Sequence, residues 1–280
     1  MLAIALALGS SLAWGVSDFL GGLKSRTVPL LGVLLISQGT ALILLSVAVT
    51  SLGEGPPGGS FLLYAALAGL AETVGVAALY RGLAVGVMSI VAPVAATAPV
   101  VPVVMGIALG ELPSPVQGAG IALAAVGIVL TAFQPDSVNL SRPGATASVV
   151  FGLLTALGFG AFYVAMDAAS EGEIPWALMV ARLTAVSVFL VAALFARSGL
   201  AMRRAHIPVL VAIGVLVIAG DAMYATASTH GLLSVVAALS TLYPIVTIAL
   251  ARAFLGERVE RLQRAGVAIC LCGVVTISAG

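Results

Sequence analysis

Charged side chains are scarce in this chain: only 8% of its 280 residues are Asp, Glu, Lys or Arg, whereas 61% are hydrophobic. A soluble globular domain is about one quarter charged, so this chain lacks the polar side chains needed to cover a surface in water. Lysine occurs once, cysteine twice, and the net charge is +1. This near balance of charge argues against a nucleic-acid partner, and the cysteines are too few for a disulfide framework.

Signatures of catalysis and cofactor binding are also missing. The sequence has neither the G-x-x-x-x-G-K-[ST] loop that binds nucleotide phosphates nor the H-E-x-x-H motif that binds zinc. We therefore expect no cofactor and no metal ion. Acid–base groups inside apolar runs leave an intramembrane enzyme as an alternative, but no nucleophile accompanies them. The sequence predicts a protein that is not an enzyme.

Long apolar stretches fill most of the chain. Runs of roughly twenty apolar residues recur, and each is long enough to cross a bilayer as a helix. Turn-forming segments separate them, such as GEGPPGG at 53–59 and QPDSVNLSRPG at 134–144. The sequence therefore predicts an all-α membrane protein with ten transmembrane helices. The ten spans are expected near residues 2–22, 29–51, 61–80, 85–109, 115–134, 147–169, 175–196, 208–228, 232–254 and 263–279.

The two halves of the chain resemble each other at a shift of 145 residues, as GVMSIVA at 86–92 and GLLSVVA at 231–237 illustrate. Each half has five spans, and this odd number requires the second half to cross the bilayer in the opposite direction. We predict two inverted five-helix repeats, 1–134 and 147–280, joined by a loop at 135–146. Inverted repeats are typical of secondary transporters. Other matched pairs are Gly69 and Gly214, Gly75 and Gly220, Pro99 and Pro244, and Trp14 and Phe159.

Longer motifs of the first copy have counterparts in the second. The first copy has LAWG (12–15), ALYRGLAVGVMSIVAPV (78–94) and a GE pair followed by QGAGIALAAVGIVL (117–130), and the second has GFG (158–160), THGLLSVVAALSTLYP (229–244) and LGERVERLQRAGVAI (255–269). These motifs resemble those of EamA-type proteins of the drug/metabolite transporter superfamily, and the resemblance covers essentially the whole chain. It implies a small-molecule transporter whose cavity is lined by spans one, three, four, six, eight and nine. It does not identify the substrate, because such proteins move amino acids, sugars, drugs and other metabolites.

Two carboxylates lie inside apolar spans, where a charge costs about 2.5–3.5 kcal/mol on insertion scales. Glu72 is near the middle of span 61–80, and Asp221 is just past the middle of span 208–228. The repeat shift maps Glu72 onto position 217, one helical turn before Asp221, so both side chains occupy the same face of related helices. We predict that they line a shared cavity and exchange protons or bind a cationic group. The alternative is a polar clamp between helices.

Arg182 lies about a third of the way into span 175–196. Its guanidinium can neutralise a buried carboxylate or bind the carboxylate of a substrate. Together with the acids it mildly favours an amino acid or related zwitterion as substrate. The alternative is a structural ion pair with Asp18 or Asp167. Asp18 is itself a candidate for substrate binding, although its position near the end of span one also fits the membrane interface.

Aromatic residues make up only 6% of the chain, so those inside spans are candidates for the cavity wall. Tyr224 follows Asp221 by three residues and shares its helical face. The implied cavity would bring these rings around the substrate, whereas the alternative for each ring is packing or contact with lipid. The aromatic candidates for substrate binding are Trp14, Phe159, Tyr163, Tyr224 and Tyr243.

These features favour a secondary active transporter, a proton-coupled exporter that moves a small metabolite by alternating access, with Glu72 and Asp221 as proton-coupling residues. An uncoupled facilitator and a non-transporting membrane scaffold remain as alternatives. The expected partners are a small-molecule substrate, protons and the lipid bilayer. We expect a monomer, with a dimer as the alternative. The Ala-, Gly- and Val-rich composition favours a bacterial plasma membrane.

Basic residues gather in the loops that follow odd-numbered spans, whereas the other loops contain acids such as Glu111 and Glu171. Cytoplasmic loops are enriched in Lys and Arg, so this distribution places both termini outside the cytoplasm. Members of the resembling family often have both termini inside the cytoplasm. The orientation therefore stays open at this point.

Overall fold

The computed structural model describes residues 1–25, 27–53, 55–56, 58, 60–85, 91, 94–132, 145–195, 203–255 and 261–279. Within these ranges the chain is helical, and no residue is in a β-strand. Six of the described helices are long and apolar enough to cross a membrane, by length and composition. The predicted all-α class is therefore confirmed, while the count of ten spans stays a prediction. So do the repeat bounds, since the connecting loop at 135–146 lies almost entirely outside the described residues.

The helices follow one another in the predicted order, but α3 continues to Val85, and the span predicted over 85–109 has turns at 96–99 ahead of α5. In the first half they are α1 (Leu2–Ser25), α2 (Leu30–Leu52), α3 (Phe61–Val85), α5 (Val100–Ala108) and α6 (Pro115–Ala132). The second half contains α7 (Ala145–Ser170), α8 (Ile174–Phe195), the short 3-10 helix η2 (Arg204–His206), α9 (Ile207–Ser228), α10 (Leu233–Ser240), α11 (Tyr243–Leu255) and α12 (Arg261–Ala279).

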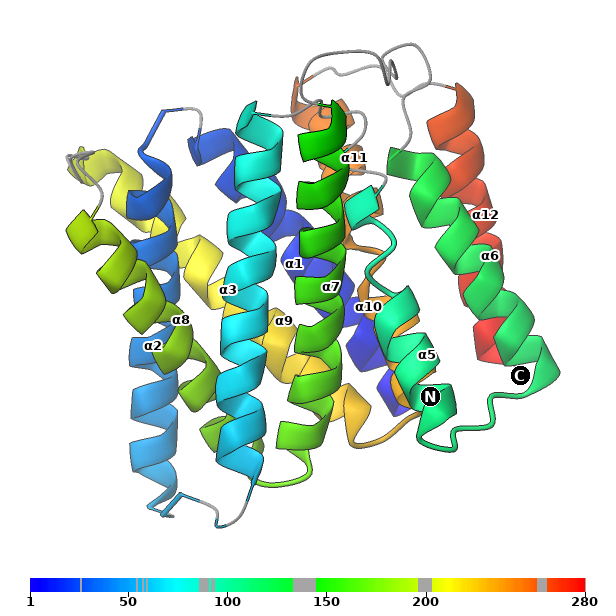
Figure 1. Ribbon diagram of the computed structural model, residues 1–280, viewed down its shortest axis with the longest axis horizontal. Coiled ribbons are helices and arrows are strands. Elements are labelled where there is room, and N and C mark those ends of the chain that lie inside the picture. The colour runs from blue at the N-terminus through cyan, green and yellow to red at the C-terminus, as the bar shows by residue number, and fades with distance from the viewer. Residues whose placement is uncertain are drawn as a thin grey trace.

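Both chain termini lie toward one end of the helical bundle, the lower end in Figure 1, which we call the terminal face. The α7–α8 and α9–α10 connections lie on this face too. The connection between α1 and α2 and the 3-10 helix η2 lie at the other end, the opposite face. The terminal face carries the acids Glu111, Glu171 and Glu173, whereas the opposite face carries Lys24, Arg203, Arg204 and Arg261.

Corresponding helices of the two halves run in opposite directions in Figure 1. The first helix, α1, leaves the terminal face, whereas its counterpart α7 runs toward it, and α6 and α12 show the same reversal. Contacts between the halves also come in matched pairs: α3 packs on α7 as α1 packs on α9, and α3 packs on α8 as α2 packs on α9. This pattern is the one expected for repeats related by a pseudo-two-fold axis in the membrane plane.

Glycines allow the matched helices to approach closely. A Cβ atom added to Gly75 would lie 2.7 Å from the Phe159 ring, and one added to Gly220 would lie 2.6 Å from the Trp14 ring. Gly75 and Gly220 are repeat mates, and so are Phe159 and Trp14. Small residues at helix interfaces permit such contacts in membranes. Two glycines therefore position two of the predicted cavity residues in the same manner.

The structure divides the helix expected over 232–254 into two. The first part, α10, ends at Ser240, and α11 begins at Tyr243. Pro244 explains the break, because its ring clashes with the carbonyl four residues earlier and its nitrogen has no hydrogen to donate. A broken helix is tolerated at membrane depth where protein surrounds it. Both parts pack against α1, which places the break at the boundary between the halves.

Large apolar side chains cover much of the outer surface. Leu194 is 84% exposed and Phe254 is 74% exposed. Such a surface would be unfavourable in water but is compatible with lipid tails, which are as apolar as the side chains themselves. This explains how a chain with so few charges can fold without a polar surface.

Glu111 holds the first turn of α10, although it belongs to the other half of the chain. Its carboxylate accepts the backbone N–H of Leu233 and, at 3.0 Å, that of Ser234. Both donors lack partners inside their own helix, and the helix dipole further favours a negative group there. We expect Glu111→Ala to lower the melting temperature by about 2–6 °C, since losing such a cap costs about 1–2 kcal/mol.

The matched control for this change is Glu171→Ala, which removes another exposed acid of the terminal face, one that lies in the turn between α7 and α8 ahead of the N-cap position of α8. Thermal denaturation of the purified proteins in detergent measures both effects. Equal shifts for the two variants would show that the contact with α10 contributes no stability of its own.

Candidate functional site

A cavity of about 120 Å³ lies between the two halves of the chain, where α1, α2, α3, α7, α9 and α11 meet. Span 29–51 (α2) therefore lines it, whereas no described lining residue comes from span 85–109, which the family resemblance implied. The cavity is partly open and its wall is mostly apolar. Two of the nine candidates, Arg182 and Tyr224, do not line it. The candidates that do line it are Trp14, Asp18, Glu72, Phe159, Tyr163, Asp221 and Tyr243.

Arg182 lies just behind the cavity wall and is completely buried. From α8 its guanidinium donates to both oxygens of Glu72, at 3.0 and 2.5 Å, and to Oδ2 of Asp221 at 2.7 Å. It also donates to the side-chain oxygen of Gln38. The other oxygen of Asp221 accepts the Trp14 indole N–H at 3.0 Å. This network joins α1, α2, α3, α8 and α9.

One cation therefore serves two carboxylates. Both ion pairs found among the described residues are formed by Arg182, one with Glu72 and one with Asp221. The alternative in which Arg182 pairs with Asp18 or Asp167 is wrong. With both carboxylates ionised the network has one uncompensated negative charge, and a buried net charge is costly. One proton, or one cation in the cavity, would balance it.

Sequence reasoning missed Gln38, which is buried on α2 and contacts both the cavity and Arg182. Two signals were present. An amide in an apolar helix needs a partner, and the repeat shift maps Ser37, its neighbour, onto Arg182. Gln38 therefore lies one position after Ser37, the residue of the first half that corresponds to Arg182 in the second half.

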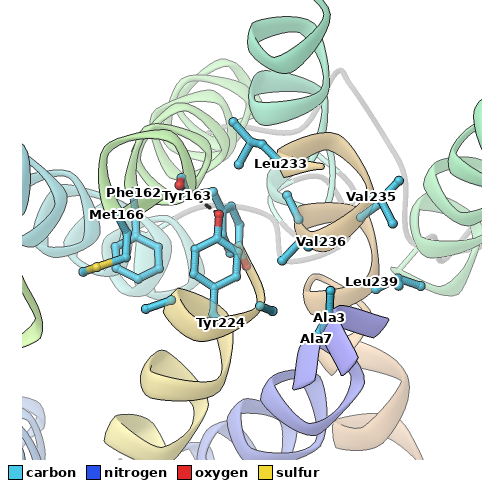
Figure 2. Packing of buried hydrophobic residues seen from close by; sticks show 14 of the residues in the cluster. Ala3, Ala7, Phe162, Tyr163, Met166, Tyr224, Leu233, Val235, Val236 and Leu239 are labelled. Carbon is cyan, nitrogen blue, oxygen red and sulfur yellow. Dashed lines mark hydrogen bonds between the residues drawn. The ribbon is translucent and has the colours of Figure 1, made fainter. Parts of the chain in front are cut away.

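Tyr224 is fully buried below the cavity, on the side of the terminal face. Its hydroxyl donates to the backbone oxygen of Tyr163 at 2.8 Å, a bond that Figure 2 shows beside Phe162 and Met166. Leu233, at the start of α10, belongs to the same buried cluster. We call Phe162, Tyr163, Met166, Tyr224 and Leu233 the plug, because they close the cavity toward the terminal face.

The family model described as the EamA-like transporter family matches the chain twice, over residues 1–133 and 146–279. The chain belongs to this family. It is accordingly a multi-pass membrane transporter of the drug/metabolite transporter superfamily, as the sequence motifs predict. No curated protein matches the chain. A solved crystal structure of a protein superposes with a TM-score of 0.81 at 15% identity, covering 99% of this chain and 96% of that one, which shows a shared fold.

In this EamA-like transporter, matched positions of the two halves carry side chains of different size around the cavity. Gly21 lines the cavity on α1, and its repeat mate on α7 is Met166, a plug residue. Ser17 likewise corresponds to Phe162. Small side chains leave space toward the opposite face, and large ones fill the equivalent space toward the terminal face. On α2 and α8 the matched pairs are Val33 with Leu178 and Ser37 with Arg182.

Proposed function

We propose that this EamA-like transporter is a secondary active carrier that exchanges protons for a small metabolite by alternating access. One observation carries the proposal: a single buried arginine is shared by Glu72 and Asp221 at the wall of a central cavity. Because a net charge in the membrane interior is costly, the site is favourable when it holds one further positive charge. A proton and a cationic group of the substrate then compete for the same place, which couples their movements.

The inverted arrangement of the halves supports alternating access. Repeats of this kind rock about a central site and open it to either side in turn. In the described state the plug separates the cavity from the terminal face. The cavity extends toward the opposite face, where the basic side chains lie. If that face is cytoplasmic, as basic residues indicate, the carrier takes up its substrate from the cytoplasm and works as an exporter. We extend the proposal to a bacterial plasma membrane on the basis of composition.

Purified protein in liposomes with an imposed pH gradient tests the coupling. The probe is a panel of proteinogenic amino acids, simple amines and neutral sugars, with an enclosed pH-sensitive dye to report proton movement. We expect at least one compound to move against protons. Glu72→Gln and Asp221→Asn should each lower the gradient-driven flux by about tenfold or more. Each substitution removes a negative charge for which the proton and the cationic group of the substrate compete.

The matched control is Asp167→Asn, which neutralises a carboxylate of α7 outside the cavity wall and should leave the flux unchanged. Flux that ignores the gradient and survives both substitutions would favour the uncoupled facilitator. A native protein that moves no compound of the panel would favour the scaffold.

A further inference from the structure

We propose that the cavity binds a small organic cation, held by Asp18 and by the surrounding aromatic rings, rather than an amino acid or another zwitterion. The inference rests on the proposed function, because it names the class of substrate for the same cavity. Three observations support it: a carboxylate that has no partner among the described side chains, a ring of aromatic side chains, and an arginine whose donors are already bound to protein oxygens.

Asp18 is the carboxylate that has no partner among the described side chains. It lies on α1 one helical turn after Trp14, on the same face of the helix, and its side chain is accessible from the cavity. Among the side chains and backbone groups that the structure describes, none donates a hydrogen bond to its carboxylate or forms an ion pair with it. Glu72 and Asp221, by contrast, are both bound by Arg182. A lone carboxylate inside a membrane cavity is a natural counter-ion for a ligand.

Aromatic rings surround the space that Asp18 faces. The Trp14 ring lies 5.9 Å from that of Tyr163, 6.3 Å from that of Phe162 and 6.5 Å from that of Tyr243, measured between centroids. Phe159 completes this wall. Aromatic faces attract cations, and several rings around one space form the cage that recognises quaternary ammonium groups.

Arg182 cannot bind the carboxylate of a substrate in this state. It is completely buried, and both of its terminal nitrogens already bind protein oxygens. Its remaining nitrogen, Nε, is buried too. None of the described residues that line the cavity is basic, whereas three of them are acidic. The carboxylate of an amino acid would therefore meet only like charge.

The size of the cavity limits the cation. Its volume of about 120 Å³ is slightly below that of an engineered cavity of about 150 Å³ that takes up benzene. A compound with a few heavy atoms around the charge fits this space. Choline has the required charge and size and serves as the probe.

Equilibrium binding to the full chain in detergent tests the proposal, measured by calorimetry without a pH gradient. Three probes of similar shape separate the contribution of charge to binding from that of shape. They are choline, its neutral isostere 3,3-dimethylbutan-1-ol, and the zwitterion glycine betaine. We expect choline to bind about tenfold or more tighter than either of the others. Asp18→Asn should lower the affinity for choline by about tenfold while leaving that for the neutral isostere unchanged.

Two further variants make the result specific. Asp18→Glu keeps the charge and should retain a preference for choline, and Asp167→Asn removes a carboxylate outside the cavity wall and should change neither affinity. Binding of the neutral isostere shows that each variant is folded. The proposal is overturned if choline does not bind, if it binds no better than its isostere, if glycine betaine binds more tightly, or if Asp18→Asn keeps the affinity for choline.

These outcomes are independent of proton coupling. Choline binding without proton exchange in liposomes would leave this inference intact and remove the proposed mechanism. Gradient-driven flux of zwitterions, with no preference for cations, would support the proposed mechanism and overturn the inference of a cationic substrate.

Discussion

Replacing Arg182 by methionine should destabilise the protein by about 3–5 kcal/mol, because removing one partner of a buried ion pair leaves the other charged and unpaired. Here Glu72 and Asp221 lose their common cation together, and Gln38 loses its donor. The network joins five helices, so we expect a sharp fall in melting temperature and in the yield of monodisperse protein. Size-exclusion chromatography after graded heating measures both.

A triple variant separates charge balance from shape. Arg182→Met combined with Glu72→Gln and Asp221→Asn removes the cation and both acids at once, and replacing a whole buried ionic cluster is often neutral for stability. We expect the triple variant to regain most of the lost stability but no gradient-driven flux. Arg182→Lys is the conservative control, and it should be intermediate because an ammonium group cannot pair with two oxygens of Glu72 as the planar fork does.

Two results would contradict this account of the network. One is a single variant, Arg182→Met, as stable as the native chain, which would mean that the acids are neutral in the folded state. The other is a triple variant as unstable as the single one, which would mean that Arg182 acts through packing rather than charge.

Filling the open end of the cavity should abolish transport without harming the fold. Gly21 lines the cavity, and a Cβ atom added there meets no atom within 4 Å. Gly21→Met copies the side chain of its repeat mate Met166 into this space. We expect the flux of the liposome assay and the binding of choline to fall by about tenfold or more, since a buried methionine occupies much of the cavity.

The same change should raise the melting temperature slightly, because methionine favours a helix over glycine by about 0.5–1 kcal/mol. Gly22→Met is the matched control: it is the next residue of α1, it does not line the cavity, and it should leave flux and binding unchanged. A stable Gly21→Met protein with native flux would mean that the substrate does not pass this end of the cavity.

Much of the architecture follows from the sequence because it depends on local patterns. Apolar runs predict the helices, and the 145-residue shift predicts which helices are equivalent. Gly75 and Gly220 then make matched contacts with Phe159 and Trp14, as repeat mates should. The break between α10 and α11 lies beside Pro244, where backbone chemistry requires it.

The partners of the charged groups could not be predicted in this way. Helical spacing states which face a side chain occupies, but not which neighbouring helix it meets or at what depth. Arg182 therefore had two wrong candidate partners, and Gln38 was overlooked. Tyr224 does share the face of Asp221, yet it lies one turn nearer the terminal face, where its hydroxyl reaches the backbone of α7 instead of the cavity.

The unequal sizes of Gly21 and Met166 have a thermodynamic consequence. In a carrier with two identical halves, the two conformations, each open to one side, would have equal free energies, and each would be occupied half of the time. Substitutions that differ between the halves lift this degeneracy, and each 1.4 kcal/mol of difference shifts the resting ratio about tenfold. In the alternating-access carrier that we propose, the empty protein is then open mainly to one side of the membrane, and a ligand offered from the other side must use part of its binding energy to convert it.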